Sequence, residues 1–339
     1  MIASRDLRNA GTDLALAAKE PNGTVVKPKQ SQNTTLSELA DESLYLIGRP
    51  TLKQFIRFVK REAIAPTDDA TLIEEWQAAK NHIRTLEKEE AGHADHPVIN
   101  PIEVGGKYKP LLVEFLNDPL VRHGFNTVPT EVAFVELDRL VVYQHHIDLT
   151  FVRHLQQKLG PTPSDEDIFR TCLPYDHPQP PAKWSRVDDG TFVFLSPSND
   201  MRFLGPMRLR SGNLQDYPPP GALVGVLGLA VGFGCNFLNA IQVENRLILN
   251  NGSHRAYALR DMGFTHVPCV VQHVSTRDEL DLVAPAPVRR DPDNFLKGTR
   301  PSMLKDYLNP KLRKVLPVHR RLKQITVKFE VSEVSIPAL

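Results

Sequence analysis

Cysteine is scarce in this chain of 339 residues, and the three that occur, Cys172, Cys235 and Cys269, are widely separated. No Cys-x-x-Cys pair is present, so the sequence offers neither a cysteine-built zinc site nor a disulfide framework. The first twenty residues lack the apolar core of a secretory leader. An odd number of thiols without this leader is typical of a reducing compartment, and we expect a cytoplasmic protein.

The chain also lacks a net charge of either sign. Its 41 Lys and Arg residues against 40 Asp and Glu leave a formal charge of +1 at pH 7. The overall charge therefore gives no reason to expect nucleic-acid binding. A local excess of basic residues over 286–330 does favour a phosphate-rich partner such as DNA. No aromatic platform or zinc-finger spacing accompanies this excess, so the DNA prediction depends on charge alone.

Long apolar runs are absent except for one uncharged stretch, residues 221–241. Its length is close to that of a membrane span. Five glycines weaken any helix there, and Asn236 and Asn239 lie near its end. We therefore expect no membrane contact, and we expect this stretch to form a buried glycine-rich strand or loop inside a soluble core.

Composition and periodicity divide the chain into four parts. The polar residues 1–40 are predicted to form a mobile N-terminal arm. Residues 41–130 are predicted to be helical, and residues 131–275 to form a compact domain of mixed strands and helices. A proline-rich insertion at 161–236 interrupts that domain. Residues 276–339 are predicted to be a basic C-terminal extension.

Local signals place several elements within these parts. Pro50-Thr51 and Asp68-Asp69 are each predicted to begin a helix, the first followed by apolar residues at helical spacing and the second by good helix formers. Later in the chain, residues 237–252 alternate as in a β-hairpin with its turn at Glu244-Asn245. Helical spacing over 253–263 and an apolar run over 266–274 predict a helix and then a strand.

The turn between that hairpin and that helix reads Asn-Gly-Ser-His-Arg. Gly252 permits a tight backbone with positive φ, and Ser253 is in the position of an N-cap. The first amides of a helix at 253–263 point into this turn and can bind an anion. His254 adds an imidazole donor and Arg255 a planar guanidinium. The chemistry of these residues predicts a phosphate-binding turn.

This pattern, with the following Val-Pro-x-Val-Val strand, resembles the ParB/sulfiredoxin-like superfamily, whose members carry Gly-x-x-Arg or Gly-x-His-Arg at the start of a helix. Upstream, residues 132–160 read as a strand that leads to Gln144, followed by a helix that buries Phe151 and ends at Gly160. Members of the superfamily often have a Gln ahead of that helix. The resemblance covers residues 132–160 and 237–274.

The resemblance implies a compact α/β (α+β) fold that binds a nucleotide, ATP or CTP, with Mg²⁺ as a further cofactor. Gly252, Ser253, His254 and Arg255 would contact its phosphates, and Gln144 would lie near the same pocket. Phosphoryl transfer or nucleotide hydrolysis would need a carboxylate. The candidates, among which nothing in the sequence chooses, are Glu136, Asp138 and Asp148.

Departures from the superfamily restrict its implied activities. Sulfiredoxins have a reactive cysteine where this chain has Ser253, so sulfinic-acid reduction is not expected. Partition proteins add a helix-turn-helix, and none is recognisable over 275–339. A Gly-x-Ser-x-Gly elbow is absent, which argues against a serine hydrolase. The adjacent His145 and His146 point to different sides of the chain, so we predict no metal site there.

Two hypotheses from different classes therefore remain. The first is a nucleotide-binding protein in which turnover stays open. The second is a non-enzymatic DNA-associated protein of partition or regulatory type that acts through its basic C-terminal tail. A homo-oligomer is compatible with both.

Overall fold

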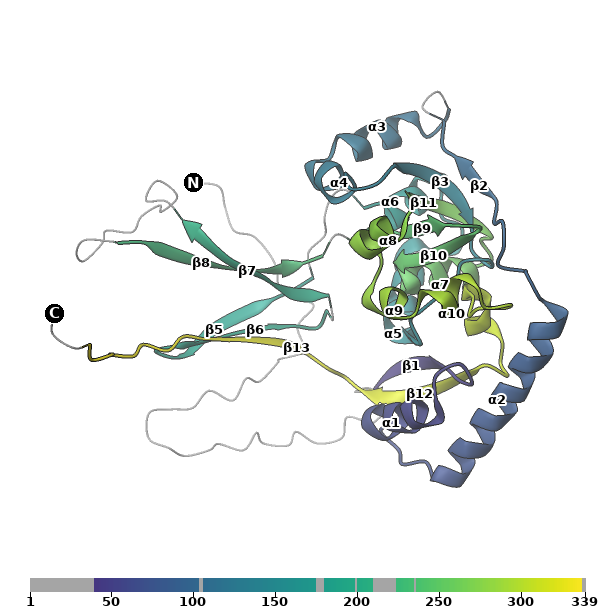
Figure 1. Cartoon of the computed structure of the whole chain (residues 1–339), viewed down its shortest axis with the longest axis horizontal. Coiled ribbons are helices and arrows are strands. Elements are labelled where there is room, and N and C mark those ends of the chain that lie inside the picture. Colours follow the sequence, from purple (N-terminus) through teal and green to yellow (C-terminus); the bar gives the residue numbers. More distant parts are fainter. Residues whose placement is uncertain are drawn as a thin grey trace. The chain divides into compact units, whose positions relative to one another are not determined.

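The computed structural model describes residues 40–103, 106–174, 180–198, 200–209, 224–234 and 236–336. The predicted arm, residues 1–40, lies outside these ranges except for its last residue. Helices and several separate sheets make up the described chain (Figure 1), which confirms the predicted α+β class. No helix in the described ranges is long and apolar enough to cross a membrane.

The largest sheet has five strands in the order β10-β9-β11-β3-β2. These strands are β2 (Ile99–Pro101), β3 (Thr130–Glu136), β9 (Asn239–Val243), β10 (Arg246–Asn251) and β11 (His266–Val274). Strands β9 and β10 form the predicted hairpin, in which Val243 pairs with Arg246. Strand β11 runs parallel to β9, since the helix α7 (Ser253–Asp261) crosses between β10 and β11.

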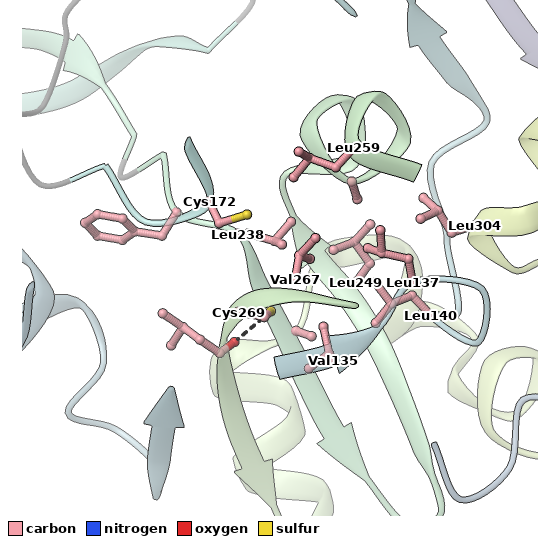
Figure 2. Close-up of a cluster of buried hydrophobic side chains, with 14 of the residues drawn as sticks. Val135, Leu137, Leu140, Cys172, Leu238, Leu249, Leu259, Val267, Cys269 and Leu304 are labelled. Atoms are coloured by element: carbon pink, nitrogen blue, oxygen red, sulfur yellow. Dashed lines mark hydrogen bonds between the residues drawn. The ribbon is translucent and has the colours of Figure 1, made fainter. Parts of the chain in front are cut away.

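The main hydrophobic core surrounds β11, the middle strand of this sheet. Val267, Cys269 and Val271 on one face and Val270 on the other are all buried, as expected for a strand covered on both faces. Figure 2 shows Leu259 of α7 lying over Leu249 and the neighbouring apolar side chains. Each such leucine contributes about 1.5–3 kcal/mol through burial, so the core fixes where α7 begins and ends.

A second, three-stranded antiparallel sheet has the order β12-β1-β4. Its strands are β1 (Ala40–Leu46), β4 (His146–Asp148) and β12 (Arg313–His319). The helices α1 (Leu52–Glu62) and α2 (Asp69–Glu89) begin at the two predicted positions, where Thr51 and Asp68 are the N-caps, and both pack against it. Strand β1 pairs with β12 along its whole length. Backbone hydrogen bonds therefore join the parts at 41–130 and 276–339, and strand β1 adds a strand to a part predicted to be helical.

Two small sheets lie mostly within the predicted insertion. One has the order β13-β6-β5, and the other is the antiparallel pair β7-β8. Their strands are β5 (Lys183–Asp188), β6 (Thr191–Ser196), β7 (Met201–Leu209), β8 (Val226–Phe233) and β13 (Lys323–Lys328). The uncharged stretch at 221–241 thus supplies strand β8. This strand is partly exposed and does not form the interior of the core that was expected of it.

The remaining helices are short. They are α3 (Lys109–Asn117), α4 (Pro119–Gly124), α5 (Leu149–Leu159), α6 (Asp165–Cys172), α8 (Arg277–Val283), α9 (Ala286–Arg290), α10 (Pro292–Leu296) and the 3₁₀ helix η3 (Leu304–Leu308). Helix α5 ends at Gly160, as predicted, with the glycine at φ 72°.

A buried ion-pair network holds the chain beyond Arg300 against helix α2. The Arg300 guanidinium, 2% exposed, donates to Asp306 Oδ1 at 2.6 Å and to Glu90 Oε2 at 2.9 Å. Lys305 Nζ lies 2.9 Å from the same Glu90 oxygen. The network thereby links the end of α2 to η3, just before the chain enters β12.

We predict that the Arg300→Met variant loses about 3–5 kcal/mol of unfolding free energy, because Asp306 would stay buried without its counter-charge. Lys297→Met is the matched control, since both partners of the Lys297–Asp293 pair are exposed and its loss should cost less than about 1 kcal/mol. Urea unfolding of both variants measures this difference. Equal, small losses would show that the network does not hold the C-terminal segment.

Candidate functional site

The predicted phosphate turn is the junction between β10 and α7. Gly252 adopts φ 95°, in the left-handed region that favours glycine. A Cβ added at Gly252 would lie 2.6 Å from Leu238 Cδ1, so the site also lacks room for a larger residue. The carbonyl of Gly252 accepts the first helical bond, from the Ala256 amide at 2.9 Å. The three backbone amides at 253–255 therefore have no carbonyl partner within the helix.

The prediction of Ser253 as the N-cap of helix α7 is wrong: Gly252 is the N-cap, Ser253 is the buried first residue of the helix, and no side chain caps it. Its first amides carry the partial positive charge of the helix dipole, which attracts anions. Helix α5 runs beside α7 in the same direction. The Phe151 ring meets the His254 ring edge-on at 5.7 Å near both helix starts, and further along Gln156 Nε2 donates to Asp261 at 2.9 Å. The two helix N-termini therefore lie on the same side.

His254 is the unusual side chain at this turn. Its Nε2 atom is buried and has no hydrogen-bond partner among the described residues. Burial, with smaller effects from His146 and Arg255, lowers the pKa of His254 to about 4. The imidazole is thus neutral at pH 7. A buried polar nitrogen without a partner costs about 1–3 kcal/mol, and in the tautomer that carries the proton on Nε2 a bound anion would provide the missing partner.

Arg255 is placed differently from its neighbour. Its Nη1 atom donates to the carbonyls of Thr171 at 3.1 Å, Cys172 at 3.2 Å and Asn236, and Nη2 donates to Asn236 Oδ1 at 2.8 Å. The residue is 5% exposed, and burial lowers its pKa to about 10, which leaves it charged at pH 7. Arg255 thus supports the turn from inside the fold. A phosphate contact from this guanidinium would require it to give up some of these bonds.

Gln144 lies on the chain segment that leads into β4. Its Nε2 atom donates to the carbonyl of His146 at 2.9 Å, and its own carbonyl accepts the Tyr307 hydroxyl at 2.5 Å. These bonds fix the two adjacent histidines. The Nδ1 atom of His145 is a second buried nitrogen without a described partner, and burial lowers the pKa of both His145 and His146.

The histidines do not assemble a metal centre in the described part of the chain. No group of three or more His, Cys, Asp or Glu side chains there is arranged to hold a metal ion. The His146 ring lies 6.1 Å from the Phe58 ring, and the His145 ring 6.3 Å from the Tyr45 ring. Aromatic packing is therefore the main environment of both imidazoles.

The three candidate carboxylates are separated by the fold. Asp138 forms an ion pair with Arg260 through both carboxylate oxygens, at 2.7 and 3.0 Å. Arg260 lies near the end of α7, roughly 12 Å from Gly252 by helix rise. Glu136 pairs with Arg139 at 3.2 Å. Asp148 accepts the Phe151 amide at 2.9 Å as the cap of α5. Since Phe151 contacts His254, Asp148 is the candidate carboxylate that lies on the side of the phosphate turn.

Phe151 is a site residue that the sequence pattern misplaced. Helical periodicity predicts it to be buried, but its side chain is 46% exposed beside His254. The partners of Arg255 were also missed, since Thr171 and Asn236 are distant in sequence and no local pattern connects them. The unpartnered state of His254 Nε2 likewise has no sequence signal.

Comparisons with known proteins identified no related protein. No family model, no curated protein and no solved structure matches the chain. The resemblance to the ParB/sulfiredoxin-like superfamily therefore depends on its motifs and stays a prediction.

We predict that Gly252→Ala lowers the unfolding free energy by about 3 kcal/mol, from left-handed backbone strain and from contact with Leu238. Gly263→Ala is a matched control because Gly263 has φ 96° but no atom within 4 Å of an added Cβ. This control should cost only about 1 kcal/mol, for the backbone alone. Thermal or urea unfolding measures both, and equal losses would contradict close packing at the turn.

We predict that His254 makes the protein less stable as the pH falls from 6.5 to about 4. Over this range the imidazole is protonated in the unfolded chain but stays neutral in the folded one. The unfolded state therefore binds more protons, and a fall in pH favours it. Relative to His254→Gln, the wild-type chain should lose about 2 kcal/mol of unfolding free energy, after allowance for partial exposure. Urea unfolding at several pH values tests this, and parallel profiles would refute it.

Proposed function

We propose that this protein binds a nucleotide, ATP or CTP, through phosphates held at the N-terminus of α7. The observation that carries the proposal is an uncapped helix start beside a buried imidazole nitrogen, His254 Nε2, that has no described partner. One phosphate oxygen could accept from the amides at 253–255 while another accepts from the imidazole N–H. The resemblance of the Gly252–Arg255 motif to nucleotide-binding turns supports the same assignment.

The surroundings of the turn favour a nucleotide over a simple phosphate. Phe151 presents a half-exposed ring next to His254, and such a ring is a platform on which a base can stack. Asp148 supplies a carboxylate on the same side, and Gln144 fixes the nearby histidine segment. Mg²⁺ characteristically combines one or two carboxylates with ligand phosphates, so Asp148 is our candidate for a shared magnesium ion.

Turnover is a separate question from binding. Phosphoryl transfer or hydrolysis needs a group that positions the attacking oxygen. Glu136 and Asp138 are paired with arginines, so Asp148 is the candidate that remains for this role. Buried thiols at Cys172 and Cys269 fit the expected cytoplasmic location, which we include in the proposal.

The DNA-associated alternative depends on cations that the fold largely uses elsewhere. Several basic residues of the C-terminal part form ion pairs with acidic residues of the N-terminal part, namely Arg300 with Glu90, Lys314 with Glu75, Arg320 with Asp41 and Arg321 with Glu62. A DNA phosphate would have to compete with these carboxylates. We therefore keep DNA binding only as an outcome that the experiment below can reveal.

We predict that calorimetric titration detects binding of ATP or CTP and that Mg²⁺ strengthens it. The His254→Phe variant removes the imidazole donor and should weaken affinity by about tenfold, the effect of one hydrogen bond to a charged group. His254→Gln keeps a donor and should recover part of the loss. His154→Phe, at an exposed position of α5, is the matched control and should bind like the wild type.

The absence of heat with ATP, ADP and CTP at millimolar concentration would refute the proposal. Equal affinity of His254→Phe and His154→Phe would move the site away from this turn. Low-salt binding of a DNA duplex that weakens in a Lys323→Gln, Lys328→Gln double variant would support the alternative instead, since both lysines are exposed.

A further inference from the structure

Strands β7 and β8 form an unusual unit because, within the described chain, they pair only with each other. A two-stranded sheet is at best marginally stable in water by itself. This one also exposes large apolar side chains. Phe203, Leu204, Met207 and Leu227 are between 45% and 60% exposed. Exposed apolar surface next to unpaired strand edges is typical of an interaction site.

The outer edge of β7 is protected against further pairing. Pro206 lacks an amide hydrogen, and the register shifts between Phe203 and Gly205, where Gly205 has φ 118°. Arg202 and Arg208 add charge to the same strand. A proline, a bulge and charges are the devices that natural sheets use to block edges. The free edge of this unit is therefore that of β8.

The edge of β8 carries no such protection. Its sequence, 226-VLGLAVGF-233, contains neither a charge nor a proline. Pro206 lies opposite Leu229, and a proline fits only where the amide would point away from the partner strand. Opposite residues of an antiparallel pair direct their backbone groups either both inward or both outward. The N–H and C=O of Leu229 therefore point toward the outer edge of β8.

Strand β8 also has two different faces. Leu227, Leu229, Val231 and Phe233 alternate on one face, and glycines with Ala230 lie on the other. The small face is already covered from β7, because a Cβ added at Gly228 would lie 3.1 Å from both Met207 and Leu209. The large apolar face is then the one that a new neighbour would extend.

We propose that β8 pairs edge to edge and antiparallel with β8 of a second copy of this chain, which makes a four-stranded sheet across a two-fold axis. A second copy is the occupant that this edge fits, because β8 carries no charge along its length and can therefore pair with itself without repulsion. In such a symmetric pair, residues opposite each other have their side chains on the same face of the joined sheet. The large apolar faces of the two copies therefore form one continuous surface. The proposal does not depend on nucleotide binding.

The symmetric pairing also places Leu229 at the axis. If the two-fold axis passes through the middle of the strand, Leu229 lies directly or diagonally opposite its own copy, at about 5–8 Å. An eight-residue strand edge buries less than the area of a standard interface, roughly 1,600 Å² in total. We therefore expect a weak, reversible dimer.

Sedimentation velocity of the full-length chain over a wide concentration range tests the proposal. The wild type should dimerise, whereas Leu229→Lys and Leu229→Glu should each be monomeric, because two like charges meet at the axis. A 1:1 mixture of the two variants should dimerise again, since Lys then meets Glu. Leu204→Lys is the matched control on β7, where Leu204 is 60% exposed, and it should remain dimeric.

A wild type that stays monomeric at every concentration would overturn the proposal. So would a mixture of folded Lys and Glu variants that does not dimerise. Hydrogen–deuterium exchange of the wild type gives a readout that needs no variant: β8 amides should gain protection as concentration rises, and β7 amides should not. Equal exchange of β8 at all concentrations would likewise reject it.

Discussion

One buried guanidinium holds together the segments from which the candidate site is built. Arg255 bonds to Thr171 and Cys172 at the end of α6 and to Asn236 just before β9, while its own backbone begins α7. Removing a charge from water is costly, and here several hydrogen bonds offset that cost without a carboxylate in direct contact. The carbonyls at the end of α6 also stabilise the positive charge of Arg255, because the C-terminus of a helix carries partial negative charge.

This role of Arg255 determines what the turn can offer a ligand. With its guanidinium held inside, the anion-binding groups that remain are backbone amides and the neutral imidazole of His254. These groups are dipoles and carry no full charge, so a bound polyphosphate would keep most of its negative charge. That situation favours a ligand that arrives with a divalent cation, and it makes the nearby Asp148 meaningful as a metal ligand and not as a repulsive neighbour.

Local structure was predictable from sequence wherever neighbouring residues decide it. The helix starts at Thr51 and Asp68, the hairpin turn at Glu244 and the end of α5 at Gly160 all form as predicted, because each depends on hydrogen bonds or backbone angles within a few residues. The site's chemistry was predictable only as a set of residue types at 252–255.

Long-range pairing was not predictable in this way. Nothing in the alternation of β1 indicates that its partner is β12, some 270 residues later in the chain, because any apolar strand could supply the same pattern. The partners of Arg255 and the exposure of Phe151 have the same origin. Both follow from how distant elements pack against each other. A hydrophobic pattern indicates that one face of an element is buried, but it does not indicate which other element covers that face.

The two proposed surfaces are close together along the chain. Strand β8 ends at Phe233, and Asn236, which holds Arg255 by both its carbonyl and its side chain, follows three residues later. Any coupling between the two proposed sites would be reciprocal, because each ligand would have to change the affinity for the other by the same factor.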